Sequence, residues 1–94
     1  MFVVLLSYKK PIEVVDQHLI EHRQFLEEGY QKHYFIASGP QNPRTGGVII
    51  SQLKDRAKLE AILKNDPFSI HAVAEYKLIE FEPVKFHQDF AGFV

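Results

Sequence analysis

The sequence predicts an α+β fold in which four strands and two helices follow one another in the order β-α-β-β-α-β. Two observations support this prediction. Phe2–Tyr8 and Ala74–Glu82 have the composition and alternation of strands, and two stretches between them repeat apolar residues with helical spacing. In this ferredoxin-like topology the four strands form one antiparallel sheet, and both helices cover the same face of it.

The N-terminal half provides the first strand and the longer helix. Phe2–Tyr8 is apolar at almost every position, which is typical of a strand buried on both faces. Pro11 suits the first turn of a helix, which we expect to run from about Ile12 to Lys32. Its apolar stripe has spacings of four, three and four residues and consists of Val15, Leu19, His22 and Leu26. This spacing predicts that His22 points inward.

A loop of turn-forming residues connects the second strand, His33–Ala37, to the third strand, Gly47–Leu53. Ser38-Gly39-Pro40 is expected to open this loop and Gly46-Gly47 to close it, because glycine permits positive φ and proline fixes φ. The loop is longer than a tight hairpin requires, and such loops are often functional.

Four residues of this loop are candidates for substrate binding: Ser38, Gly39, Pro40 and Arg44. Arg44 has the donor geometry to hold a carboxylate or phenolate oxygen, and the alternative is an ordinary solvated charge. Ser38 has a hydroxyl that can donate a hydrogen bond to a ligand or merely cap the turn.

The C-terminal half provides the second helix and the last strand. Asp55 is a favourable N-cap for a helix over Arg56–Asn65, which Pro67 helps to end. We expect a short turn over Phe68–Ala72 before the strand Ala74–Glu82. One face of the helix carries its inward-pointing residues, which are Leu59, Ile62, Leu63 and, at its end, Asp66.

Length and composition restrict the organisation and the function. The 94 residues fit one domain, 1–94, with 46% hydrophobic and 24% charged residues. A net charge of −1 with scattered basic residues does not predict nucleic-acid binding. The sequence has no cysteine for disulfides or thiolate metal sites, no apolar run long enough to span a membrane and no signal-peptide pattern. We therefore expect a cytoplasmic protein that binds neither nucleic acid nor membranes.

A homodimer is also predicted. A first strand buried on both faces needs a cover that the helices do not provide, and a second subunit is the simplest one. The tail, residues 83–94, is expected to dock on that partner because it carries three aromatic residues, Phe86, Phe90 and Phe93.

His22 and Asp66 are the strongest candidates for chemistry. Both are ionisable and lie on helix faces predicted to point inward, so each needs a partner. A carboxylate bound to one imidazole nitrogen fixes the tautomer and leaves the other nitrogen as a general base. The alternative is a structural hydrogen bond that satisfies two buried groups.

A second pattern involves a metal. His18-Leu19-Ile20-Glu21-His22 matches the H-x-x-E-H motif of inverted zinc proteases. The pattern is short, however, and no third ligand is evident, so we expect no metal. The remaining histidines, His33, His71 and His87, have no evident partners in the sequence.

Several segments together resemble the YCII-like (YCII-related) domain family, and the resemblance covers nearly the whole chain. They are Phe2–Tyr8, the stretch from His22 to Gly29, Ala37-Ser38-Gly39-Pro40, the stretch from Gly46 to Ile50, and Asp66-Pro67-Phe68 followed by Ala74-Glu75-Tyr76.

The resemblance implies a dimeric α+β barrel and an active site built on a histidine and an aspartate. These fall on His22 and Asp66 here, with the Ser-Gly-Pro turn at Ser38–Pro40 near the same pocket. One lineage of the family is linked to dehydrochlorination of chlorinated hydroxyquinol rings. His18 is an additional histidine one turn before the family position.

We therefore expect a small enzyme that uses a His22–Asp66 dyad on a small, hydroxylated or aromatic substrate, without a cofactor. The first alternative is a non-catalytic module that binds a small molecule or a protein and has a structural His–Asp pair. A third hypothesis is haem or quinone oxidation, which related barrels perform.

Overall fold

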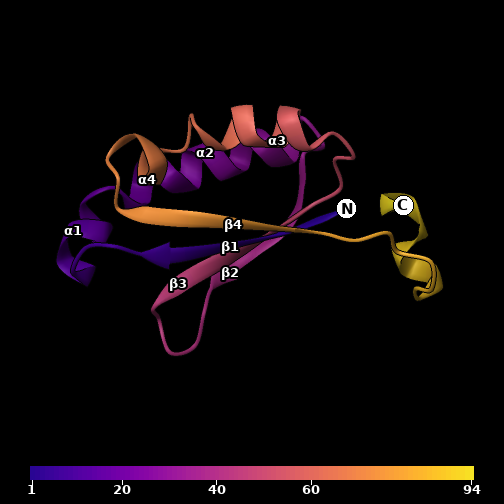
Figure 1. Cartoon of the computed structure of the whole chain (residues 1–94), viewed down its shortest axis with the longest axis horizontal. Coiled ribbons are helices and arrows are strands. Elements are labelled where there is room, and N and C mark those ends of the chain that lie inside the picture. The colour runs from indigo at the N-terminus through magenta and orange to yellow at the C-terminus, as the bar shows by residue number, and fades with distance from the viewer.

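The computed structural model describes all residues, 1–94, and confirms the predicted α+β architecture (Figure 1). One antiparallel sheet has the strand order β2-β3-β1-β4. Its strands are β1 (Phe2–Tyr8), β2 (Phe35–Pro40), β3 (Gly46–Ser51) and β4 (Ala74–Glu80). The helices are α1 (Ile12–Gln17), α2 (Leu19–Gln31), α3 (Arg56–Leu63) and α4 (Pro67–Ile70), followed by a 3₁₀ helix, η1 (Gln88–Phe93). Figure 1 shows α2, α3 and α4 together on one face of the sheet.

The first predicted helix is interrupted, which corrects the sequence expectation of a continuous Ile12–Lys32 helix. His18 has φ −111° and ψ 7°, outside helical values, and it separates α1 from α2. Figure 1 shows α1 lying beyond the end of the sheet while α2 runs across it. The interruption therefore lets α2 pack on the sheet in a direction that α1 does not share.

The loop after β2 is shorter than expected. Ser38-Gly39-Pro40 belongs to β2, where Gly39 pairs with Val48 and Pro40 with Gly47, so the connection spans only residues 41–45. β2 is the outer strand of the sheet, and such a strand tolerates proline because one of its edges has no ladder partner.

The predicted role of the glycines in this loop is wrong, because no glycine of the chain has a positive φ. Gly46 is required for another reason: a Cβ at this position would overlap the backbone oxygen of Leu6 on the neighbouring strand.

The second helix ends slightly earlier than predicted, and the short turn after it is a helix. The side chain of Asp55 accepts a hydrogen bond from the backbone N–H of Lys58, as expected for an N-cap. Asp66 caps α4 in the same way, accepting from the backbone N–H of Phe68. Asp66 is thus fixed by the local backbone as well as by its tertiary contacts.

The core lies between the sheet and the helices. Phe2, Val4 and Leu6 of β1 are buried there and pack with a set of buried residues from the other elements, including Val15, Phe35, Ile49, Leu59, Leu63 and Phe68. In the single chain β1 is buried on one face only, and the burial of its other face by a partner subunit stays a prediction. Val3 and Leu5, on the opposite face, are only half-buried, because no helix of this chain covers that face.

The tail leaves the sheet at one end of the molecule, close to the N-terminus (Figure 1). Met1 and Phe81 exchange two hydrogen bonds through their backbone groups. Beyond this link the rings of Phe90 and Phe93 pack on each other with centroids 5.4 Å apart, and Phe86 remains exposed. The docking of this tail on a second subunit stays a prediction. None of the helices has the length and apolar character needed to cross a membrane.

Candidate active site

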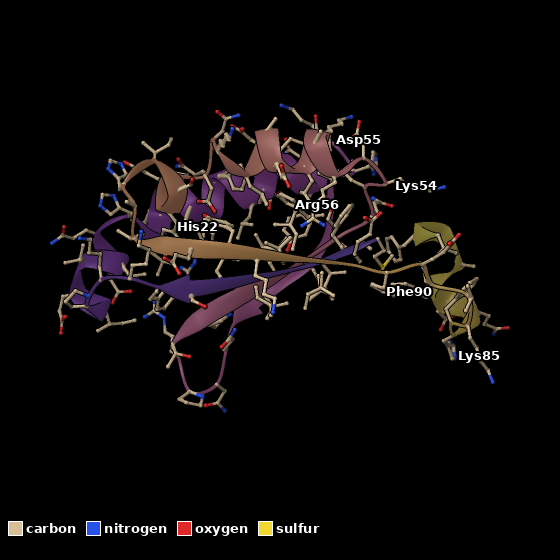
Figure 2. The ribbon with its side chains drawn as sticks, viewed as in Figure 1. His22, Lys54, Asp55, Arg56, Lys85 and Phe90 are labelled. Atoms are coloured by element: carbon tan, nitrogen blue, oxygen red, sulfur yellow. The ribbon has the colours of Figure 1, made fainter.

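His22 and Asp66 lie side by side although 44 residues separate them in the sequence. His22 is on α2, and Asp66 is the N-cap of α4. Nδ1 of His22 is 2.8 Å from Oδ1 of Asp66, and the two side chains are buried, with 8% and 0% of the residue exposed. Figure 2 shows His22 between the helical layer and the sheet.

Three hydrogen bonds converge on the Asp66 carboxylate. Besides His22, the backbone N–H of Phe68 donates to Oδ1 at 3.0 Å, and the Tyr76 hydroxyl donates to Oδ2 at 2.6 Å. A carboxylate surrounded by donors acts as an acceptor only, which assigns the proton of this pair to Nδ1 of His22. The lone pair of the imidazole is then on Nε2.

Tyr76 completes the surroundings of Asp66 and was not identified as a site residue from the sequence. Burial raises the pKa of the Tyr76 phenol, and the negative charge of Asp66 raises it further. The phenol therefore stays protonated and keeps donating to Asp66. The sequence feature that could have identified Tyr76 as a site residue is its position on β4, in the segment Ala74-Glu75-Tyr76.

Aromatic packing fixes the plane of the His22 ring. The imidazole stacks on the Phe68 ring with centroids 3.9 Å apart and 3° between the planes. Tyr8 contacts the same phenyl ring edge-on, at 6.1 Å. With one nitrogen held by Asp66 and one face held by Phe68, the imidazole has little freedom to turn.

The second nitrogen of His22, Nε2, has no partner within the chain. No buried side-chain nitrogen or oxygen of the structure lacks a hydrogen-bond partner, and Nε2 has no partner, so Nε2 is accessible. His22 lines a cavity of about 450 Å³ between α2 and the sheet. The four predicted substrate-binding residues, Ser38, Gly39, Pro40 and Arg44, line the same cavity, whereas Asp66 does not.

Arg44 and Ser38 both have partners within the chain. Arg44 donates to Asp16 of α1 at 2.7 Å, and its guanidinium lies 5.7 Å from the centre of the Tyr8 ring. The hydrogen bond to Asp16, supported by Tyr8, raises the pKa of Arg44 further above its usual value. Ser38 shares a short hydrogen bond with the Tyr30 hydroxyl. The two residues thus present groups that are already oriented.

Arg23 is a further cation at the cavity, and sequence reasoning missed it. It follows His22 on α2, lines the cavity and forms no ion pair with any carboxylate of the chain. Arg23 directly follows the inward-facing His22. Consecutive residues on a helix point about 100° apart, so the sequence could have indicated that Arg23 lies at the edge of the inward face.

The H-x-x-E-H pattern does not form one site. His22 turns to Asp66, while His18 stacks on His71 with ring centroids 3.9 Å apart. His18 lies at the junction of α1 and α2, and the two imidazoles of the pattern have different partners. His71, for which the sequence showed no partner, therefore has one.

Comparisons with known proteins identify the family and the fold. The YCII-related domain matches residues 1–82. Among solved structures, the chain is similar to 5-chloro-2-hydroxyhydroquinone dehydrochlorinase (TftG) from Burkholderia phenoliruptrix AC1100, in complex with 2,5-dihydroxybenzoquinone. The TM-score is 0.71 at 17% sequence identity, and the match covers 87% of this chain and 94% of that chain. No curated protein sequence matches the chain.

The structural likeness at this identity shows a shared fold. The family match covers the whole sheet, all four α-helices and both members of the His22–Asp66 pair, leaving only the tail, residues 83–94, outside. The chain therefore belongs to the YCII-related domain family.

Proposed function

We propose that this protein is a small acid–base enzyme in which His22 transfers a proton and Asp66 orients and polarises it. The observation that carries the proposal is the asymmetry of the imidazole. Nδ1 is held by a fully buried carboxylate, and Nε2 is accessible at a cavity of about 450 Å³. This is the arrangement that a general base requires.

The chemistry follows from the hydrogen bonds. Asp66 fixes the Nδ1–H tautomer, so Nε2 can accept a proton from a substrate held in the cavity. The imidazolium that forms is stabilised by the adjacent negative charge, as in other His–Asp pairs. In an isomerisation the imidazolium returns the proton to another atom of the same substrate; in an elimination the leaving group departs with the bonding electrons and the proton is released to solvent; in a hydration the proton comes from the attacking water and is delivered to the substrate.

The negative charge that develops on the substrate needs donors nearby. Arg44, Arg23 and Ser38 line the cavity and supply guanidinium and hydroxyl groups. Arg44 is also positioned by Asp16, so it loses little freedom when a ligand binds. We propose that these residues bind the oxygen atoms of the substrate.

The substrate class we propose is a small hydroxylated ring, either aromatic or quinoid. A cavity of this volume lies in the range of about 300–1,000 Å³ that is usual for small-molecule sites. Apolar residues such as Leu6, Leu19 and Leu26 line it beside the polar groups. The complex of TftG with 2,5-dihydroxybenzoquinone supports this class.

Two variants test the catalytic role, with 2,5-dihydroxybenzoquinone as the ligand probe and chloride release from 5-chloro-2-hydroxyhydroquinone as the activity assay. His22→Gln should lower the rate by about 10²–10⁴-fold, the usual contribution of a general base. Asp66→Asn should also lower it, because the amide can stabilise the opposite tautomer. His87→Gln, in the exposed tail, is the matched control.

The outcomes distinguish an acid–base enzyme from a non-catalytic binding module. If His22→Gln turns over at the wild-type rate, the catalytic role is wrong. If the probe binds, no compound of this class reacts and both variants lose only stability, a non-catalytic binding module with a structural pair is the better description. The complete set of hydrogen bonds around Asp66 is the observation that favours this second candidate.

We also propose that two copies pair through the open face of the sheet. That face presents half-buried Val3, Leu5, Val48 and Ile50, with exposed Ile79 beside them on β4. Covering them would remove apolar side chains from water. Light scattering should give twice the mass of 10.9 kDa, and Leu5→Lys should return the protein to the mass of one chain. A single-chain mass for the wild type would reject the dimer.

A further inference from the structure

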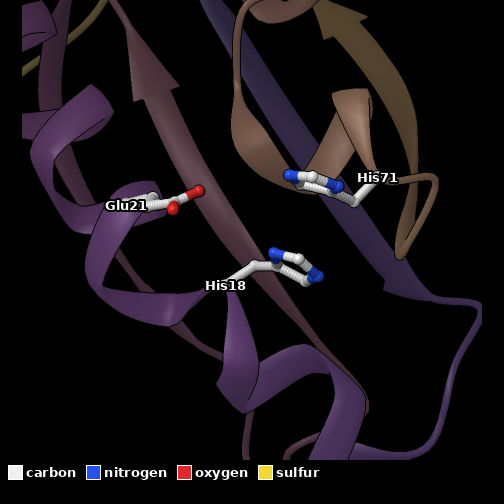
Figure 3. Close-up of side chains that lie close together, drawn as sticks. All are labelled: His18, Glu21 and His71. Atoms are coloured by element: carbon white, nitrogen blue, oxygen red, sulfur yellow. The ribbon is translucent and has the colours of Figure 1, made fainter.

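We propose that His18, Glu21 and His71 form a binding site for one zinc-like divalent cation, next to the acid–base pair but nearer the start of α2 and the end of α4. His18 lies at the junction of α1 and α2, Glu21 follows one turn later on α2, and His71 ends α4. Figure 3 shows the Glu21 carboxylate directed toward the two imidazoles.

The three side chains already lie close to the separation that a metal needs. One potential ligand atom from each residue lies within 4.8 Å of the other two. Zinc binds nitrogen and oxygen at about 2.0–2.2 Å, so ligand atoms in a tetrahedral site lie roughly 3.3 Å apart. A closure of about 1.5 Å would complete the site, within reach of side-chain rotation.

The rings must also turn. His18 and His71 are stacked at 3.9 Å with only 16° between their planes, so the lone pairs of their nitrogens lie in two nearly parallel planes. Rotation of one ring about its Cβ–Cγ bond makes the lone pairs converge on one point. His71 and Glu21 are exposed and His18 is half-buried, so solvent leaves room for this movement.

None of the three side chains has another polar partner in the chain. They form no ion pair and no side-chain hydrogen bond with any other residue. A cation would therefore displace no existing interaction except the stacking of the two rings. It would also neutralise the unpaired charge of Glu21 in this cluster.

The donor set indicates the class of ion. Two imidazole nitrogens and one carboxylate oxygen suit zinc and neighbouring transition metals, whereas calcium and magnesium prefer all-oxygen sites. Three protein ligands leave at least one coordination position for water. The proposal goes beyond the H-x-x-E-H pattern, because the third ligand comes from α4 and His22 takes no part.

Metal binding would join the same two helices that the acid–base pair joins. His18 and Glu21 belong to the start of α2 and His71 to the end of α4, while His22 and Asp66 link the same helices internally. An ion that binds the folded chain alone raises its stability by mass action. The site is independent of the proposed catalysis, so either can fail without the other.

The test is a titration of the metal-free full chain with Zn²⁺, followed by calorimetry, and with Co²⁺, followed by visible absorption. We expect one equivalent to bind and the melting temperature to rise. His71→Gln and Glu21→Gln should each weaken binding by more than about 100-fold, since even outer-sphere changes cost 10–100-fold. His87→Gln, which removes an exposed histidine outside the cluster, should bind like the wild type.

Three results would overturn the proposal: no binding of Zn²⁺ to the wild type, unchanged affinity in both cluster variants, or loss of binding in His87→Gln. Circular dichroism checks that each variant is folded. If His71→Gln does not fold, Glu21→Gln decides, because this exposed residue contributes no side-chain hydrogen bond to the apo protein.

Discussion

His22 and His18 lie four residues apart at the start of the same helix, yet their surroundings are opposite. His22 is buried against Phe68, and its Nδ1 bonds to a carboxylate that no solvent reaches. His18 is half-buried, stacks on His71 and has no hydrogen bond from its ring. The chain thus places one histidine in a rigid pair and the other in an adaptable cluster.

The comparison teaches that burial, more than residue type, decides what a histidine can do. A buried imidazole must have its polar atoms satisfied, so its partner and tautomer are fixed in advance. A histidine near the surface can form its hydrogen bonds with water at little cost, so its ring is free to turn toward an ion. The same substitution should therefore have different effects at the two places.

The largest difference in the free energy of unfolding is expected between variants of the two carboxylates, Asp66 and Glu21. Asp66→Ala should lower the free energy of unfolding by about 3–5 kcal/mol, because it leaves two buried donors and one partly buried donor without an acceptor. Glu21→Ala should change it by less than about 0.5 kcal/mol in metal-free buffer. Urea unfolding followed by circular dichroism measures both. Equal losses would show that the burial argument is wrong.

The histidines themselves should differ less. His22→Ala should cost about 2–4 kcal/mol, since it removes the stack on Phe68 and one partner of Asp66. His18→Ala should cost less than about 1 kcal/mol, since His18 loses only a stack near the surface. The comparison uses the same urea assay, and a larger loss for His18 would contradict it.

Tyr76→Phe tests how much the Tyr76 hydroxyl stabilises the His22–Asp66 pair. It removes one hydrogen bond to Asp66 and keeps the ring, so the expected loss is about 1.5 kcal/mol. The matched control is Tyr34→Phe, because the Tyr34 hydroxyl forms no hydrogen bond and its loss should be within about 0.5 kcal/mol. A neutral Tyr76→Phe would mean that His22 and Phe68 alone satisfy Asp66.

The smallest effect concerns pH. The pKa of Tyr76 is raised in the folded protein, so the folded state keeps a proton that the unfolded state loses above about pH 10. The contribution of Tyr76 to stability is complete below that pH and decreases as the pH rises beyond it. Unfolding between pH 8 and 11 should show a steeper decline for the wild type than for Tyr76→Phe. Parallel curves would reject this assignment.

The sequence was sufficient to predict the order of strands and helices and the inward face of α2. Alternation in Ala74–Glu80, the apolar run in Phe2–Tyr8 and the N-cap at Asp55 are local signals that act within a few residues. The spacing of apolar residues in the two helices also predicted that His22 and Asp66 point inward, and the resemblance to the family supported pairing them.

Other features depended on contacts between distant segments. The interruption at His18, the extension of β2 through Pro40 and the need for glycine at Gly46 follow from how the elements pack, and no local pattern encodes them. Arg23 and Tyr76 became recognisable only when α2 and β4 placed them at the cavity and at Asp66.

The sequence by itself determined which residues face inward, because hydrophobic periodicity is a property of neighbouring residues along the chain. Only the tertiary structure brought these groups into contact: it paired His22 with Asp66, as predicted, and His18 with His71, which the sequence did not predict. The partner of His22 is 44 residues away, and that of His18 is 53 residues away at the end of another helix. Such contacts depend on how the helices pack on the sheet, so the spacing within one helix cannot specify them.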